Sequence, residues 1–163
     1  MISTPISFTA DGRRVDASPH DGAMTLASYL RDFVGITSIN VGCEEGACGA
    51  CTALVDGRPV PTCLMFVARA DGAVIETAAA IAETRFGAAI IRSIVEGAGL
   101  QCGFCTPGIV CTTFAYLTEA TAPVDNAAVA AALSGHLCRC TGYQSLVSAV
   151  VGAAEQVSVA GRG

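Results

Sequence analysis

The chain has 163 residues, of which 52% are hydrophobic and only 14% are charged, and its mean hydropathy is +0.56. This composition excludes a disordered chain, and the length suits one ordinary domain or two small ones. The net charge of −5 argues against a protein that binds nucleic acid by neutralising phosphates. Nine cysteines are too many for packing alone, yet too few for a small disulfide scaffold.

The N-terminal segment lacks a positive region followed by an apolar stretch, so no secretory signal is expected. Residues 97–118 carry no charge over a length that would span a bilayer, but they contain Gln101, cysteines and the helix breakers Gly103 and Pro107. We therefore expect a buried segment around a site and no membrane span. We expect a cytoplasmic location. In the cytoplasm thiols stay reduced, and clustered cysteines more often bind metal.

Residues 1–76 are predicted to be rich in strands. Alternating apolar residues flank two Asp-Gly pairs, at Asp11 and Asp56, which favour tight hairpin turns. Thr25 is expected to cap a helix, because apolar residues including Phe33 follow it at helical spacing. The strands are expected at residues 6–9, 13–17, 52–55, 59–60, 63–67 and 74–75.

From about residue 77 the periodicity becomes helical, after an alanine-rich segment that is typical of a connector. Pro107 suits the first turn of a helix, and Asp125 suits the cap of the next one, which Gly135 would close. The expected helices run through residues 86–95, 107–117, 125–134 and 146–154.

The first cysteine set combines a C-x4-C-x2-C run with a fourth cysteine further along the chain, which is the spacing of plant-type 2Fe–2S ferredoxins. Three thiolates on one tight loop can wrap a small cluster, and nearby glycines let main-chain N–H groups point at the sulfurs. A zinc site usually joins two short pairs, which this set lacks. Its members are Cys43, Cys48, Cys51 and Cys63.

The second cysteine set is ambiguous from spacing alone. Cys102 and Cys105 form a C-x2-C pair, and Cys138 and Cys140 form a distant C-x-C pair. Four thiolates in two pairs suit either structural zinc or an iron–sulfur cluster, although C-x-C is unusual for a zinc knuckle. Each pair lies near a predicted helix end, where N–H groups stabilise negative charge.

Three motifs resemble the iron–sulfur small subunit of the molybdenum hydroxylases, the family of xanthine dehydrogenase, aldehyde oxidoreductase and carbon monoxide dehydrogenase. They are GCEEGACGACTALVDG with PTCL, then GLQCGFCTPG, then HLCRCTGYQSLVSAV. The resemblance covers roughly residues 3–155 and keeps the order and spacing of eight cysteines, which favours iron over zinc at the second set. The GLQCGFCTPG motif is similar to members that work with a separate FAD subunit.

The resemblance implies an α+β fold in which an N-terminal β-grasp ferredoxin-like domain precedes a four-helix-bundle domain, each holding one 2Fe–2S cluster. Cluster 1 would take the first cysteine set and cluster 2 the second. The implied boundaries are 1–78 for the ferredoxin-like domain, 79–84 for the connector, 85–157 for the helical domain and 158–163 for a tail.

The resemblance also implies partners. A large subunit would carry molybdopterin, as the cytosine dinucleotide, and a medium subunit would carry FAD, assembled as a dimer of heterotrimers. Cys140 would contact the pterin as well as iron, and Gln101 would hydrogen-bond it; the alternative is a Gln101 that bonds only its own backbone. Electrons would pass from molybdenum through cluster 2 and cluster 1 to FAD. The substrate stays open among purines, N-heteroaromatics, aldehydes and carbon monoxide.

Several other residues fit simpler roles. Cys111 is expected to be a small buried core residue, and Tyr143 is expected to pack at the start of the last helix. Arg139 either faces solvent or a carboxylate, or contacts a partner subunit near the cofactor. His136 stands where asparagine is common in the family. The chain offers no convincing catalytic acid, base or nucleophile, so an electron-transfer subunit is the first hypothesis. The alternatives are a free-standing 2Fe–2S ferredoxin with a zinc-stabilised helical appendage and a structural metal-bound adaptor.

Overall fold

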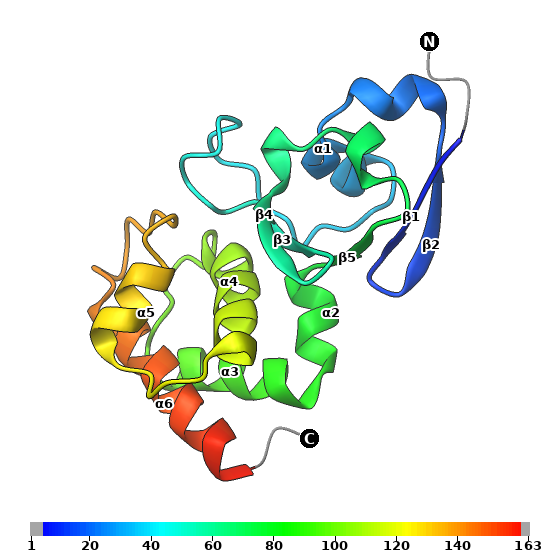
Figure 1. Ribbon diagram of the computed structural model, residues 1–163. Helices are drawn as coiled ribbons and strands as arrows, with labels where there is room; N and C mark the ends of the chain where they lie inside the picture. Colours follow the sequence, from blue (N-terminus) through cyan, green and yellow to red (C-terminus); the bar gives the residue numbers. More distant parts are fainter. Residues whose placement is uncertain (1–4, 161–163) are drawn as a thin grey trace.

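The computed structural model describes residues 5–160 and has a mixed α+β fold, with a sheet region beside a helical region (Figure 1). The five-stranded sheet has the order β2-β1-β5-β3-β4, and only the β1–β5 pair is parallel. The strands are β1 Ile6–Ala10, β2 Arg13–Ala17, β3 Thr52–Val55, β4 Arg58–Pro61 and β5 Val74–Glu76.

Both predicted hairpins are present. Asp11 and Gly12 between β1 and β2, and Asp56 and Gly57 between β3 and β4, have positive φ angles of 47° to 78°. Two consecutive left-handed residues match the right-handed twist of the flanking strands, which is why Asp-Gly suits this turn.

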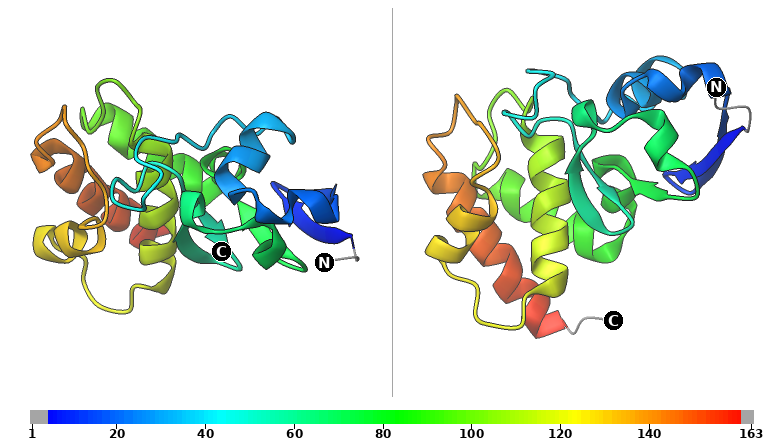
Figure 2. Two further views of the ribbon diagram at one scale, coloured as in Figure 1. Left: turned by 90° about the horizontal axis from the view of Figure 1, so that it is seen from above. Right: turned by 45° about the horizontal axis from the view of Figure 1, so that its top comes forward.

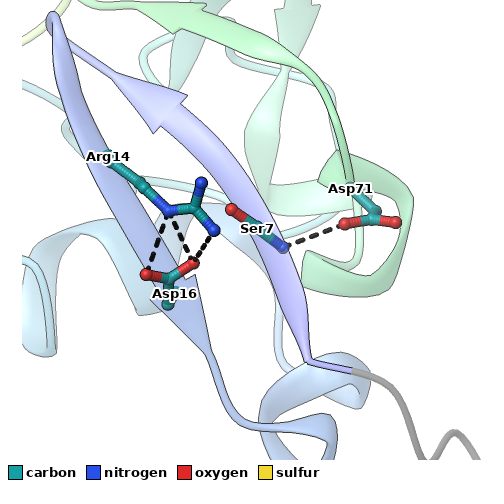
Figure 3. Close-up of polar contacts among 4 residues, drawn as sticks. All are labelled: Ser7, Arg14, Asp16 and Asp71. Atoms are coloured by element: carbon teal, nitrogen blue, oxygen red, sulfur yellow. Dashed lines mark hydrogen bonds and ion pairs between the residues drawn. The ribbon is translucent and has the colours of Figure 1, made fainter.

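Two polar contacts lie at the outer edge of the sheet (Figure 3). The Arg14 guanidinium pairs with the Asp16 carboxylate at 2.9 Å on the exposed face of β2, and this hydrogen bond lowers the pKa of Asp16. The Asp71 carboxylate accepts the backbone N–H of Ser7 at 2.9 Å. The second contact fixes β1 to the turn that precedes β5.

Helix α1, Leu26–Asp32, begins as predicted, with the Thr25 hydroxyl accepting the N–H of Ser28. Leu26 and Leu30 are fully buried. Phe33 departs from the predicted inward face, because the helix ends at Asp32 and the Phe33 side chain is 64% exposed.

The strand predicted at residues 63–67 is wrong. The chain instead forms a short 3₁₀ helix, η2 Thr62–Leu64, then a single bridge between Phe66 and Thr25, then a second 3₁₀ helix, η3 Val67–Ala70. The Thr62 hydroxyl donates to the carbonyl of Cys51 at 2.7 Å. This bond holds η2 against the end of the cysteine loop, so the local sequence turns back where an extended strand would move away.

The helical region begins with α2 Ala78–Glu83, so the segment expected as a connector is itself a short helix, capped by Thr77. The Thr84 hydroxyl caps the next helix, and the Asp125 carboxylate caps α5 at 2.8 Å as predicted. Residues 161–163 of the expected tail lie outside the described residues. The helices are α3 Arg85–Glu96, α4 Thr106–Glu119, α5 Asn126–Ala132 and α6 Gln144–Ala160.

Helix α4 joins the two regions, because it packs against β3 on one side and against α3 and α5 on the other (Figure 2). Each region has its own apolar core, and Leu54 of β3 belongs to the helical one. Cys111 of α4 is fully buried in the same core, as predicted. Within residues 5–160, no helix has the length and apolar character needed to cross a membrane.

Candidate iron–sulfur sites

The first cysteine set lies on the loop between α1 and β3 and on η2, which follows β4. Glu44, Gly46 and Gly49 have positive φ angles of 59°, 77° and 72°. Left-handed residues interspersed along a loop turn successive N–H groups inward and create a concave, anion-binding backbone. The loop therefore curls around its own cysteines, as the glycine pattern predicts.

The thiols of this set form two hydrogen-bonded pairs, Cys43 with Cys48 and Cys51 with Cys63. The N–H of Cys48 donates to Cys43 Sγ at 3.4 Å, and the N–H of Cys63 donates to Cys51 Sγ at 3.5 Å. N–H groups of Glu45 and Cys48 lower the pKa of Cys43 to about 7, whereas burial raises that of Cys63 to about 11. Thiolates are the form that binds metal, and backbone donors stabilise them.

The second cysteine set is assembled from two loops that are distant in sequence. Cys102 and Cys105 precede α4, and Cys138 and Cys140 lie between α5 and α6. Cys102 and Cys140 bring their sulfurs to 3.5 Å, and the Cys105 thiol hydrogen-bonds Cys138. This set therefore also consists of two close sulfur pairs.

Hydrogen bonds and burial shift the thiol pKa values of the second set in opposite directions. The N–H of Phe104 lowers the pKa of Cys102, and burial raises that of Cys105 to about 12. Burial opposes ionisation of Cys138, but the hydroxyl and N–H of Thr141 and the N–H of Cys140 outweigh it and lower its pKa to about 7.

Tyr143 has a larger role than the packing expected from sequence. Its backbone has a positive φ of 68°, and its hydroxyl accepts the N–H of Cys138 at 2.8 Å while donating to the carbonyl of His136 at 3.0 Å. The Tyr143 ring therefore ties down the loop that carries Cys138 and Cys140. No local pattern in the sequence indicates this, because it depends on a left-handed residue at the start of α6.

The loops that carry the two cysteine sets touch each other, with residues 43–50 beside residues 136–140 (Figures 1 and 2). The N–H of Leu137 donates to the carbonyl of Cys48 at 3.0 Å, so one hydrogen bond joins a first-set cysteine to the neighbour of Cys138. Asn40 donates to the carbonyl of Phe104 at 2.9 Å, which adds a second bond between the loops.

His136 fills the contact between the sets and is only 4% exposed. Its Nε2 lies 2.7 Å from the Thr112 hydroxyl on α4, and burial lowers its pKa, so the ring is neutral at pH 7. A Cβ on Gly49 would lie 2.5 Å from His136 Nδ1, and a Cβ on Gly108 would overlap the carbonyl oxygen of Gly49. These two glycines permit the close approach.

The second set has an exposed end. Cys102 and Cys140 are exposed, as are Gln101 and Arg139 beside them, whereas Cys51 and Cys63 of the first set are 2% and 5% exposed. Cys111, the ninth cysteine, is fully buried in the helical core, and burial raises the pKa of its thiol to about 12.

The donor set tests which metal group these residues suit. A single structural zinc ion is held by four ligands that converge on one point. A 2Fe–2S cluster takes two thiolates at each of two irons. Two sulfur pairs in each set, with backbone N–H groups aimed at sulfur, fit the binuclear group.

Comparison with protein families agrees with this chemistry. Residues 8–78 match the family described as "2Fe-2S iron-sulfur cluster binding domain", and residues 76–151 match "[2Fe-2S] binding domain". The two matches define an iron–sulfur protein with two 2Fe–2S-binding domains.

Relatives of known function narrow the class. The chain is 40% identical to the caffeine dehydrogenase subunit gamma of Pseudomonas sp. strain CBB1, over 92% of this chain and 90% of that one. It is 37% identical to the nicotinate dehydrogenase small FeS subunit of Eubacterium barkeri, over 95% and 96%. It superimposes on a chain of quinoline 2-oxidoreductase from Pseudomonas putida 86 with a TM-score of 0.84 at 37% identity, covering 98% of each chain.

The chain belongs to the family of iron–sulfur small subunits of the molybdenum hydroxylases. It is thus the iron–sulfur subunit of an oxidoreductase, and its role in such a complex is electron transfer.

Proposed function

We propose that eight cysteines ligate two 2Fe–2S clusters. The observation that carries this proposal is the arrangement of their thiols in four hydrogen-bonded pairs. Within the first set, Cys43 with Cys48 and Cys51 with Cys63 would each share one iron. Within the second set, the corresponding pairs are Cys102 with Cys140 and Cys105 with Cys138. A β-grasp domain over residues 1–78, a connector at 79–84, a four-helix-bundle domain over 85–157 and a tail at 158–163 remain the proposed organisation.

When bound, the clusters would supply one-electron transfer from the molybdopterin site, through the second set and then the first set, to FAD. The protein's own contribution is to hold the two cysteine sets in contact. The hydrogen bond from the Leu137 N–H to the Cys48 carbonyl links a cysteine of the first set to the residue before Cys138 of the second set. Buried His136 and the close Gly49–Gly108 approach exclude water from this junction.

The exposed end of the second set supports contact with molybdopterin, proposed as the cytosine dinucleotide, on a large subunit. Cys140 is exposed although it is a proposed ligand, and Gln101 is exposed beside Cys102. An exposed metal ligand is reached most easily by a cofactor of another chain. Gln101 would donate its side-chain amide to the pterin and orient it.

We infer that the acceptor is a medium, FAD-binding subunit and that the complex is a cytoplasmic dimer of heterotrimers. The relatives' names favour an N-heterocyclic aromatic substrate, since caffeine, nicotinate and quinoline all belong to that class. Selectivity among such substrates, or against aldehydes and carbon monoxide, would lie in the large subunit.

Iron and acid-labile sulfide analysis of the purified chain tests this function. We expect about four iron atoms per chain, two distinct reduced EPR spectra and no substrate turnover by the chain alone. Two iron atoms with one zinc, and a single EPR spectrum, would instead identify a free-standing ferredoxin with a zinc-stabilised appendage. A structural metal-bound adaptor would show no reversible bleaching by dithionite.

A further inference from the structure

An open groove lies beside β4, one of the two edge strands of the sheet, and we name it the β4 groove. It has a volume of about 370 Å³. Two arginines are the only charged residues in its lining, and the rest of the lining is apolar. The lining residues are Val55, Arg58, Val60, Pro61, Leu64, Met65, Phe66 and Arg69.

Two large apolar side chains of the groove are exposed to solvent. Leu64 is 57% exposed and Phe66 is 54% exposed, and both stand on the short segment after β4. Scattered surface hydrophobes are ordinary, but neighbouring ones in a concave surface mark an interaction site.

The groove is continuous with the first cysteine site. Leu64 follows Cys63 directly, and its side chain covers Gly46 on the cysteine loop so closely that a Cβ on Gly46 would overlap it. A partner seated in the β4 groove would therefore contact a side chain that lies directly over the proposed cluster 1 ligands.

The charge of the groove opposes that of the chain. The protein carries a net charge of −5, yet the groove presents the guanidinium groups of Arg58 and Arg69 without an acidic residue in its lining. Two of the four β4 residues, Pro59 and Pro61, lack an N–H, which disfavours pairing with an added strand. Recognition would therefore rest on side chains.

We propose that the β4 groove receives an acidic segment, bearing at least one apolar side chain, from the electron-accepting FAD-binding subunit. The proposal rests on the proposed function, because it assigns the docking surface of that acceptor. Arginine pairs bidentately with carboxylates, and the exposed Leu64 and Phe66 supply the apolar contact. Docking here would bring the flavin subunit to the first cysteine set and leave the exposed end of the second set free.

The test uses the assembled complex, purified through a tag on the large subunit at two salt concentrations. The double variant Arg58→Glu/Arg69→Glu is expected to lower the FAD content per complex at least tenfold at the lower salt and by less at the higher salt, where the charges are screened, with iron unchanged at about four per chain. The matched control Arg13→Glu/Arg85→Glu reverses the same number of exposed arginines outside the groove and should keep full FAD content.

A second pair of variants tests the apolar half of the groove. Phe66→Ala should lower FAD content, whereas Phe33→Ala, which removes a similarly exposed ring outside the lining, should not. Unchanged FAD content in both groove variants overturns the proposal. It is also overturned if the groove variants keep the flavin subunit but no longer bind the large subunit, or if they keep it but no longer self-associate. Failure of the proposed function itself is recognised separately, as a wild-type chain that lacks about four iron atoms.

Discussion

The two cysteine sets differ in how they are built. Three members of the first set lie on one loop, and Cys63 is brought back to it by η2. The second set exists only because the loop between α5 and α6 returns to the loop before α4, so that Cys140 reaches Cys102. The first is therefore specified by local sequence and the second by tertiary packing.

The sets also differ in burial, and this sets their roles apart. The first set places Cys51 and Cys63 in the sheet core, so part of the fold depends on them. The second set keeps Cys102 and Cys140 at the surface. A set left open at one end is suited to meet another subunit's cofactor, and a set anchored in the core by two of its cysteines is suited to relay electrons.

Removing one cysteine from each set gives the largest expected effect. Cys51→Ala and Cys140→Ala should each lower iron from about four to about two per chain, with turnover of the assembled complex lost. Only Cys140→Ala should also weaken docking to the molybdenum subunit, because Cys140 is exposed. Iron analysis and co-purification measure both effects, and unchanged metal content in either variant contradicts its ligand assignment.

The cluster-free forms sharpen the same comparison. Cys51→Ala should lower the free energy of unfolding by about 1–2 kcal/mol, since it opens a void in the sheet core. Cys140→Ala should change it by less than about 0.5 kcal/mol, because exposed substitutions away from special features have small effects. Urea unfolding of the two apoproteins measures the difference; equal losses would mean that burial does not distinguish the sets.

The junction between the sets is tested by two glycines with similar backbones. Gly49→Ala should destabilise the protein by about 3 kcal/mol, because its Cβ would meet both a left-handed φ of 72° and His136 Nδ1 at 2.5 Å. Gly103 has a φ of 81°, but a Cβ added there would have no atom within 4 Å, so Gly103→Ala should cost only the backbone strain of about 1 kcal/mol. Thermal unfolding and the magnetic coupling between the reduced clusters are the measurements, and equal effects would argue against a tight junction.

Sequence predicts the first set well and the second only in part. The spacing around Cys48 and the glycines beside it define the loop without knowledge of the fold. The C-x2-C and C-x-C pairs leave zinc open until their sulfurs are placed in pairs. The role of Tyr143 and the η2 turn at Cys63 were missed, because a left-handed residue and a hydrogen bond from Thr62 to Cys51 override local strand and helix preferences.

Adjacent threonines on α4 test how firmly His136 holds the second set. Thr112→Val removes the hydroxyl 2.7 Å from His136 Nε2 and leaves a buried ring nitrogen unpaired, at a cost of about 2 kcal/mol. Thr113→Val is the control, because its buried hydroxyl has no partner among the described residues and its removal should be neutral or stabilising by up to about 1 kcal/mol. Only Thr112→Val should alter the EPR spectrum assigned to the second set. Identical behaviour of the two variants would mean that the contact between Thr112 and His136 does not support the second set.

Replacement of the ninth cysteine is expected to leave both clusters in place. Cys111→Ala removes one sulfur from the helical core, so the free energy of unfolding should fall by about 1 kcal/mol while iron stays at about four per chain. The thiol is fully buried among the apolar side chains of the helical core. Loss of either cluster in this variant would mean that Cys111 supports a cysteine set from within the core of α4. The contrast between a first set specified by its own loop and a second set specified by packing would then be wrong.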